Sequence, residues 1–328
     1  MMKIALSLLL ASLLYLAIAM VLVWLPIKRE QTDNGLHFDQ LTIVNPVNFG
    51  GATQYFIARD GKSLFYRQLN GGGELVIILL HGSGTEGRYL LPLAQQLNQQ
   101  LDATVVVPDL RGHGKSSLTN RGDIDYLGQF THDLDDLNSH LRRQYRHAKF
   151  VLGGHSSGGG LAIRYGGEGL QQMDGYLLLA PYLGYQAPTV RENSGGWVQV
   201  VGYRYAGLAM LNNIGITQFN DKAVLFFNRP AALTGPMQAE HYSYRLNESL
   251  APQDYGMLLG NNKAPILVLV GAKDESFYAD RFESTFAAVA PHAKVQIITN
   301  VTHLGLPNDS RAMKSINQWV RSQLIAPK

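Results

Sequence analysis

The chain has 328 residues, of which 46% are hydrophobic and 16% are charged. That length suffices for one globular domain with a full core and an inserted subdomain. The formal net charge of +3 is too small to indicate a nucleic-acid partner. Cysteine is absent, which excludes disulfides, cysteine–zinc sites and a cysteine nucleophile.

The N-terminal segment is apolar and carries no charge from Ile4 to Ile27, a length that could cross a bilayer as a helix. A cleaved signal peptide is the alternative, because Ala17 and Ala19 form a small-x-small site. Cleavage there would leave a new terminus that is still strongly apolar. We therefore predict a single-pass membrane anchor over residues 1–28. The charges on the two sides of this segment nearly balance, so they do not decide its orientation. An uncleaved signal-anchor favours a following domain outside the cytoplasm, which is the periplasmic side in a bacterium.

A polar segment, residues 29–50, follows and is expected to be a linker. Two short apolar runs, Tyr55–Ala58 and Ser63–Arg67, then flank Asp60-Gly61, and this pattern predicts a β-hairpin. The continuous apolar run Leu75–Leu80 has the length of a strand. Such a run indicates a strand that is buried on both faces of a parallel sheet.

Beyond that run, β-rich and helical segments alternate as far as Pro181, and the alternation resumes near residue 263. The expected strands are Thr104–Val107, Lys149–Leu152, Gly175–Ala180, Ile266–Val270 and Lys294–Thr299. The expected helices are Arg88–Gln100, Tyr126–Tyr145, Gly158–Tyr165, Ala279–Ala290 and Ser310–Leu324. This alternation predicts an α/β fold with a doubly wound, mostly parallel sheet, formed by residues 51–182 and 263–328.

The segment Val151–Gly160 is the most informative, because it contains the pattern G-x-S-x-G at Gly154-His155-Ser156-Ser157-Gly158. It follows an expected strand and opens an expected helix, which is the context of a nucleophile elbow. The glycines remove Cβ atoms that would clash in a sharp turn, and the helix N-terminus favours developing negative charge. We predict that Ser156 is a catalytic nucleophile; the alternative is a glycine-rich turn without chemistry.

A serine nucleophile needs a base that is oriented by a third group, and in such a sheet the chain order is serine, acid, histidine. Asp274 follows the strand Ile266–Val270, and His303 follows the last expected strand, so both should lie at the carboxyl edge of the sheet. We predict Asp274 as the acid and His303 as the base. Glu275 is a weaker candidate acid, and Asp274 could instead be a helix N-cap or a surface-turn carboxylate.

Two backbone N–H groups should stabilise the oxyanion of the reaction. One is that of Ser157, directly after the nucleophile, and the other is that of Ser83 in the loop His81-Gly-Ser-Gly84. Neither glycine cluster precedes the Lys-Ser/Thr pair of a P-loop, which argues against a phosphate cradle. No metal or cofactor is expected.

Three segments carry a family resemblance: His81-Gly-Ser-Gly-Thr-Glu-Gly-Arg-Tyr89, Pro108-Asp-Leu-Arg-Gly-His-Gly-Lys-Ser116 and Gly154-His-Ser-Ser-Gly-Gly159. Through them the chain resembles the α/β-hydrolase superfamily over about residues 52–325. Within it, the chain is similar to the monoglyceride lipase and lysophospholipase-like group, also called serine aminopeptidase S33-like hydrolases. The resemblance implies a lid at residues 183–262 and a structural role for Asp109, Arg111 and His113. The chain departs from the group at Ser157, where methionine is common.

The expected lid would arch over the carboxyl edge of the sheet, above Ser156. Some of its aromatic residues should form the lid's own small core, and others should line an apolar slot: Trp197, Tyr203, Tyr205, Phe219, Phe226 and Phe227. These features predict a serine hydrolase that cleaves carboxylic esters, with monoacylglycerol- or lysophospholipid-like substrates. The alternatives are a peptidase or acyltransferase of the same fold, and a catalytically dead, membrane-tethered binding protein.

Overall fold

The computed structural model describes residues 2–29, 35–41, 49–116, 121–169 and 171–325. Eight strands form one sheet in the order β1-β2-β4-β3-β5-β6-β10-β11. Neighbouring strands from β4 to β11 are parallel, whereas β2 is antiparallel to both β1 and β4. The strands are β1 Ala52–Ile57, β2 Ser63–Leu69, β3 Leu75–Leu80, β4 Thr104–Pro108, β5 Lys149–His155, β6 Gly175–Leu179, β10 Ile266–Gly271 and β11 Lys294–Ile298. The expectation of a mostly parallel sheet is confirmed.

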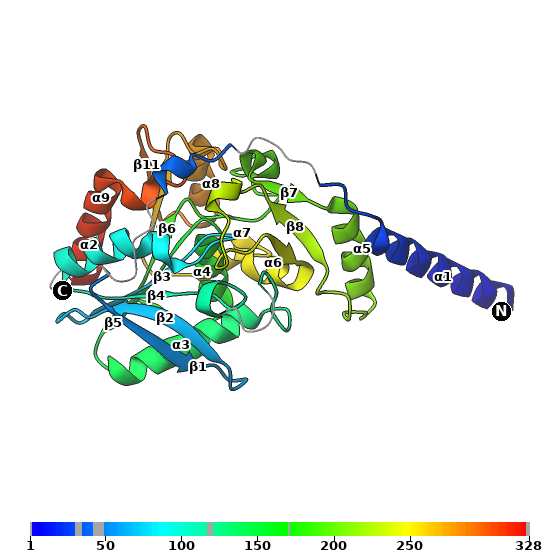
Figure 1. Cartoon of the computed structure of the whole chain (residues 1–328), viewed down its shortest axis with the longest axis horizontal. Helices are drawn as coiled ribbons and strands as arrows, with labels where there is room; N and C mark the ends of the chain where they lie inside the picture. The colour runs from blue at the N-terminus through cyan, green and yellow to red at the C-terminus, as the bar shows by residue number, and fades with distance from the viewer. Residues whose placement is uncertain (1, 30–34, 42–48, 117–120, 170, 326–328) are drawn as a thin grey trace.

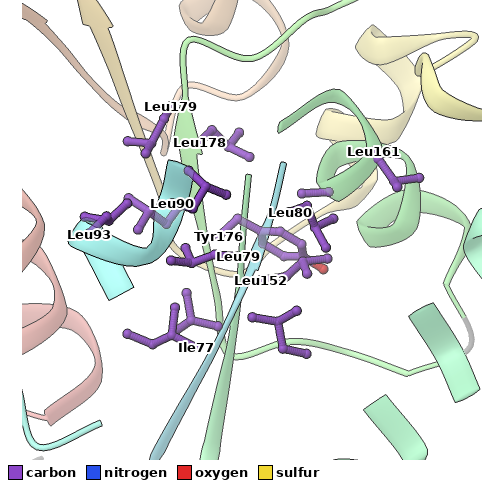
Figure 2. Packing of buried hydrophobic residues seen from close by; sticks show 14 of the residues in the cluster. Ile77, Leu79, Leu80, Leu90, Leu93, Leu152, Leu161, Tyr176, Leu178 and Leu179 are labelled. Carbon is purple, nitrogen blue, oxygen red and sulfur yellow. The ribbon is translucent and has the colours of Figure 1, made fainter. Parts of the chain in front are cut away.

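The sheet is covered by helices on both faces, with α2 beside α9 on one face and α3 beside α4 on the other (Figure 1). These helices are α2 Leu91–Leu101, α3 Gln129–Gln144, α4 Ser157–Glu168, α8 Phe282–Val289 and α9 Ser310–Val320. Every residue of β3, β4, β6 and β10 is buried, as expected of continuous apolar runs between two helical layers. Figure 2 shows this core, in which Leu93 of α2 and Leu161 of α4 approach the central strands from opposite sides.

Helix boundaries differ from the expected ones where glycine and proline act locally. The expected helix Arg88–Gln100 is a short 3-10 turn, Gly87–Leu90, followed by α2, which begins at Leu91 with proline in its first turn. Helix α3 begins only at Gln129, because Gly128 has a left-handed backbone with φ 85°.

The segment 183–262 contains a second, three-stranded antiparallel sheet that we did not predict. Its strands are β7 Val198–Val200, β8 Ala223–Phe227 and β9 His241–Ser243, and its helices are α5 Gly202–Asn213, α6 Tyr244–Leu250 and α7 Tyr255–Asn261. Strands this short carry almost no periodic pattern, which explains why the sequence did not indicate them. Helix α7 packs against α4 of the core, so the two parts of the chain are closely joined.

Helix α1, Met2–Trp24, is long and apolar enough to cross a membrane. Its N-terminal part projects away from the domain, and its other end lies beside α5 (Figure 1). The described part of residues 29–50 does more than connect α1 to the domain. Leu36 and Phe49 are buried in the main core, and Phe38 packs against it from a short 3-10 helix, Phe38–Gln40.

Candidate active site

Ser156 occupies the turn between β5 and α4 with φ 57° and ψ −122°, a conformation that costs a non-glycine residue energy. Two glycines make this turn possible. A Cβ on Gly154 would lie 2.2 Å from the backbone of Gly158, and a Cβ on Gly158 would lie 2.4 Å from the carbonyl oxygen of Leu80. The G-x-S-x-G pattern is therefore required by the close packing of the strand, the turn and the helix.

The structure brings Asp274 and His303 together at the carboxyl edge of the sheet. Nδ1 of His303 lies 2.7 Å from Oδ2 of Asp274, and both side chains are buried. The other carboxylate oxygen accepts the backbone N–H groups of Ser276 at 2.9 Å and Phe277 at 2.8 Å. These bonds hold the carboxylate in place, and the carboxylate in turn orients the imidazole ring.

The surroundings of His303 suit a proton acceptor. Burial lowers the pKa of His303, but the Asp274 carboxylate and, to a smaller extent, Glu275 together raise it by more, so the pKa lies above the ordinary 6.5. The carboxylate therefore stabilises the imidazolium that forms when the ring takes a proton. Ser156 and His303 line the same small cavity, of about 30 Å³.

Glu275, the weaker candidate acid, does not contact the imidazole ring through a hydrogen bond. Its carboxylate accepts the backbone N–H of His303 at 2.8 Å and that of His37 at 3.2 Å. Glu275 therefore ties the loop that carries His303 to the segment that follows α1. Of the two neighbouring carboxylates, the structure places Asp274 against the ring.

The two amides that we predict for the oxyanion, those of Ser83 and Ser157, belong to adjacent loops. The Ser83 hydroxyl donates to the Ser157 hydroxyl at 2.8 Å. The amides on either side of Ser83 are already bonded, because the N–H groups of Gly82 and Gly84 donate to the hydroxyls of two buried tyrosines at 2.8 Å and 2.7 Å. Within the part of the chain that the structure describes, the Ser83 N–H has no acceptor, which leaves it available to a ligand.

Sequence reasoning missed a hydrogen-bonded chain that connects the Ser83 loop with His303. The Tyr89 hydroxyl, which accepts the Gly82 N–H, lies 2.9 Å from Nδ1 of His155, and Nε2 of His155 lies 3.1 Å from the carbonyl oxygen of His303. Burial lowers the pKa of His155 well below its ordinary value, so the ring is neutral. Since Nε2–H donates to a carbonyl, Nδ1 accepts from Tyr89.

The signals for this chain were present in the sequence. His155 is the first variable position of the elbow, and Tyr89 ends the first segment of the family resemblance. Neither is a reactive residue in the predicted chemistry, and only the fold shows that they touch.

The segment 108–116 lines neither of the cavities at Ser156. Asp109 binds the buried Arg67 guanidinium at 2.6 Å, and Arg111 binds Asp133 at 2.7 Å. His113 lies 2.6 Å from the Tyr242 hydroxyl, which also holds the Gly84 amide. These contacts fit the structural role that the resemblance implies for Asp109, Arg111 and His113.

Two small cavities, of about 60 and 30 Å³, adjoin Ser156. A third cavity, of about 730 Å³, lies between α5 and the core. The larger of the two small cavities and the third one share five lining residues: Tyr182, Tyr185, Val200, Leu225 and Asn247. The cavity at Ser156 and the large cavity therefore adjoin each other at these residues.

The six lid aromatics do not all gather above Ser156. Trp197 lines both small cavities and Tyr205 lines the large one. Phe227 lies beside Trp197, with ring centroids 5.1 Å apart. The other three contact the N-terminal segment: Tyr203 binds Pro26, Phe219 packs on Trp24, and Phe226 lies below Arg29. The expected apolar slot therefore rests on fewer aromatic residues than predicted.

Among the described residues, no group of three or more side chains suited to bind a metal comes together.

Comparison with known proteins places the chain in a family. The family profile for serine aminopeptidase, S33, matches residues 73–310, most of the chain. The protein belongs to the serine aminopeptidase S33 family.

Curated relatives match parts of this S33 chain. Monoglyceride lipase from Rattus norvegicus is 31% identical over 135 residues, which are 39% of this chain and 43% of the lipase. Proline iminopeptidase from Saccharolobus solfataricus is 31% identical over 134 residues, 40% of this chain and 41% of the peptidase. The matches thus cover less than half the length of these two relatives.

Solved structures establish the α/β-hydrolase fold for this S33 member. Monoacylglycerol lipase from Paleococcus ferrophilus superposes with a TM-score of 0.58 and 18% identity, over 80% of this chain and all of that one. A thermophilic esterase from Thermogutta terrifontis superposes with a TM-score of 0.55 and 20% identity, over 83% of this chain and 98% of that one. The expected fold and family are confirmed, and the protein is a hydrolase with esterase and lipase neighbours.

Proposed function

We propose that the protein hydrolyses carboxylic esters through an acyl-enzyme on Ser156, with monoacylglycerol- or lysophospholipid-like substrates. His303 takes the serine proton as Ser156 attacks the ester carbonyl, and gives that proton to the alcohol that leaves when the ester C–O bond breaks. Asp274 orients the imidazole, and the Ser83 and Ser157 amides receive the oxyanion. Water then attacks the acyl-enzyme, with His303 again as the base. The observation that carries this proposal is the strained elbow at Ser156, in one cavity with a histidine whose Nδ1 is held by a buried carboxylate.

The size and lining of the cavities support a substrate with an apolar chain. The two cavities at Ser156 are small, but the adjoining cavity of about 730 Å³ could hold a lipid-like acyl group. Each methylene buried there would contribute up to about 0.8 kcal/mol. Among the relatives, a monoglyceride lipase and a monoacylglycerol lipase are named for lipid esters.

Arg229 favours a substrate that carries a negative charge, such as a lysophospholipid. It lines the smaller cavity with Ser156 and His303, donates to the Gly84 carbonyl at 2.7 Å and lies over the Trp197 ring. No carboxylate in the described part of the chain forms an ion pair with it. Burial lowers its pKa to about 10, so the guanidinium is still charged at neutral pH. The Glu86 carboxylate acts on Arg229 only from beyond ion-pair distance and is bound to Arg67 and Arg88, so a phosphate would provide a direct countercharge.

Labelling with a fluorophosphonate probe tests the chemistry. The wild-type protein should be labelled at Ser156, and the Ser156→Ala and His303→Ala variants should lose both labelling and ester turnover by several orders of magnitude, while remaining folded. A Ser157→Ala variant is the matched control, because it keeps the backbone amide and should still be labelled. Near-normal esterase activity in Ser156→Ala would refute the assignment, and an unlabelled wild type would favour a binding protein.

The substrate class is tested with p-nitrophenyl esters of graded chain length. We expect kcat/KM to rise from acetate to medium-chain esters of about C8 to C12, because longer chains bury more apolar surface. A preference for acetate would contradict the lipid-like substrate. Faster cleavage of aminoacyl anilides than of any ester would favour the peptidase alternative.

Arg229→Gln separates the two lipid classes. The variant should lose about tenfold or more in kcat/KM for a lysophospholipid, and much less for a monoacylglycerol with the same acyl chain. Equal losses on both substrates would assign Arg229 to support of the Gly84 loop instead of recognition of a charge.

A further inference from the structure

The C-terminal part of α1 is buried in the lid. Ala19 and Val23 have no exposed surface and pack against Leu208 and Leu211 of α5 and Val224 of β8, all of them fully buried. This cluster is separate from the main core of the domain. The lid therefore has a small core of its own, and α1 contributes two of its fully buried residues.

Polar contacts fix the same junction. Carbonyl groups at the end of α1 have no partner within the helix. Arg204 of α5 donates to two of them, to Val23 at 2.9 Å and to Leu25 at 3.3 Å, and the Tyr203 hydroxyl donates to the carbonyl of Pro26 at 2.8 Å. In the opposite sense, the Tyr15 hydroxyl donates to the carbonyl of Met210 at 3.0 Å. These bonds set the position of α5 along α1.

Gly207 allows the two helices to approach closely. A Cβ at this position would lie 2.8 Å from the Ala19 carbonyl oxygen and 2.8 Å from Cβ of Leu22. Any larger side chain would push α1 and α5 apart. The backbone at Gly207 is helical, so the close approach to α1 is the constraint that we find for glycine there.

The part of α1 that is free of the domain is short. All residues from Met2 to Leu14 are exposed, which corresponds to about 20 Å of helix. The hydrocarbon core of a bilayer is about 30 Å thick. A bilayer that surrounds the whole apolar length of α1 would therefore also reach the α1–α5 junction, so the lid would rest against the membrane.

The junction is continuous with the large cavity. Gly202, Tyr205 and Ala206 of α5 line that cavity, while Gly207 and Leu208 of the same helix face α1. Strand β8 has the same double role, because Val224 belongs to the junction and also lines the cavity. Displacement of α1 would thus alter the wall of the cavity.

We propose that α1 is a permanent structural element of the lid, and that its docking on α5 holds the wall of the large cavity in place against the membrane. Cleavage after Ala19 would remove Tyr15 and Ala19 from the junction and leave part of the apolar surface of α5 without its partner. The segment is therefore retained in the mature protein. The statement about the cavity rests on the proposed ester hydrolysis, whereas the docking of α1 does not.

Disulfide trapping tests the docking directly. Because the chain contains no cysteine, no native thiol can compete with the introduced pair. The pair Leu22→Cys and Gly207→Cys would place two Cβ atoms slightly closer than the roughly 3.5–4.5 Å of a disulfide, so a small shift closes the bond. We expect this pair to cross-link within one chain, in isolated membranes, on mild oxidation. The control pair is Leu9→Cys and Gly207→Cys. It should not cross-link, because Leu9 lies about 20 Å along α1 from Leu22.

Two results would overturn the docking. One is a mature protein whose N-terminus, measured by mass spectrometry, begins after Ala19. The other is equal cross-linking of the Leu22 and Leu9 pairs. Neither result depends on whether the protein cleaves esters, since fluorophosphonate labelling reports that separately.

Kinetics of Gly207→Leu test the effect on the cavity. This variant should retain fluorophosphonate labelling, which shows that the core is folded, but lose about tenfold in kcat/KM for a C10 ester and less than twofold for acetate. Asn213→Leu, at the exposed end of the same helix, should behave like the wild type. Equal losses of Gly207→Leu on both esters, or no loss on either, would refute the link between α1 and the cavity wall.

Discussion

At the scale of single residues, His303 has two neighbours that act on different parts of it. Asp274 holds the ring through Nδ1, and His155 holds the backbone carbonyl while its ring lies 4.6 Å from that of His303. The first contact controls the protonation of the imidazole, and the second controls where the imidazole stands. Substitutions at the two positions should therefore change different kinetic quantities.

The pH dependence should report the Asp274 contact. His303 must be neutral to accept a proton, so kcat/KM should be lost as the pH falls through its pKa, which Asp274 raises above 6.5. In Asp274→Asn, burial is opposed only by the smaller effect of Glu275, and the acid limb should move to lower pH while kcat falls by about 10²- to 10⁴-fold. Glu275→Gln is the control, with a smaller shift in the same direction. An acid limb that stays in place in Asp274→Asn would contradict this role of the carboxylate.

Tyr89→Phe should test the chain from the Ser83 loop to His303. It removes a hydroxyl that serves both the Gly82 amide and His155, and leaves two buried groups unpaired, at a cost of about 1–3 kcal/mol in the free energy of unfolding. We also expect kcat to fall by about tenfold with little change in KM. The reason is that the loop that carries the Ser83 amide loses the hydrogen bond from Gly82 to Tyr89.

Tyr165→Phe is the matched control for this substitution. Its hydroxyl is equally buried and binds Asn138 at 3.2 Å, away from both small cavities. A similar loss of stability with normal kcat is expected there. If Tyr89→Phe also kept a normal kcat, its hydroxyl would have a structural role only.

At the scale of elements, the turn from β5 to α4 depends on the close packing of strand, turn and helix. Gly154→Ala would bring a Cβ to 2.2 Å from the Gly158 backbone, which has no room to move beneath β3. We expect a loss of about 3 kcal/mol or more in the free energy of unfolding, at or above the range typical of overpacking.

Gly260→Ala in α7 serves as the control for the turn, because a Cβ there makes only an ordinary contact at 3.6 Å. Its free energy of unfolding should change by less than about 1 kcal/mol, in either direction. Equal stability of the two variants in chemical denaturation would show that the backbone at Ser156 relaxes more easily than its packing suggests.

At the scale of the whole molecule, part of the lid belongs to the main core, while α5 and Val224 of β8 form a second, small core that α1 joins. Around the end of α1, Trp24 and Phe219 pack edge to face, and the Lys222 ammonium lies over the Trp24 ring. Aromatic and basic side chains of this kind are typical of the membrane–water interface. The arrangement fits a lid at the surface of a bilayer.

Fractionation tests the anchor that we propose for residues 1–28. The full-length protein should stay in the membrane pellet after washing with alkaline carbonate, because about twenty apolar residues of α1 bind the hydrocarbon core far more strongly than a surface charge could. A surface-bound protein, held by charge alone, would be released by the same wash. Recovery of the intact chain in the supernatant would rule out a spanning anchor.

The sequence by itself determined the main sheet and the candidate site to a large extent. Continuous apolar runs such as Leu75–Leu80 predicted central strands because two helical layers bury both faces of them. Since parallel strands end at one edge of a sheet, residues just after those ends, Ser156, Asp274 and His303, could be expected to meet there. The order of these residues along the chain and the glycines around Ser156 can be recognised without knowing which distant segments are in contact.

Only the tertiary structure decided what lies around that edge. The strands β7 to β9, the Tyr89–His155 chain and the docking of α1 on α5 all depend on contacts between segments far apart in the sequence. Short strands and single buried polar residues leave no periodic pattern, and Gly207 looks like any other helical glycine until Ala19 and Leu22 lie against it. A sequence pattern reports which face of an element is buried, but the partner that buries it is chosen by packing in three dimensions.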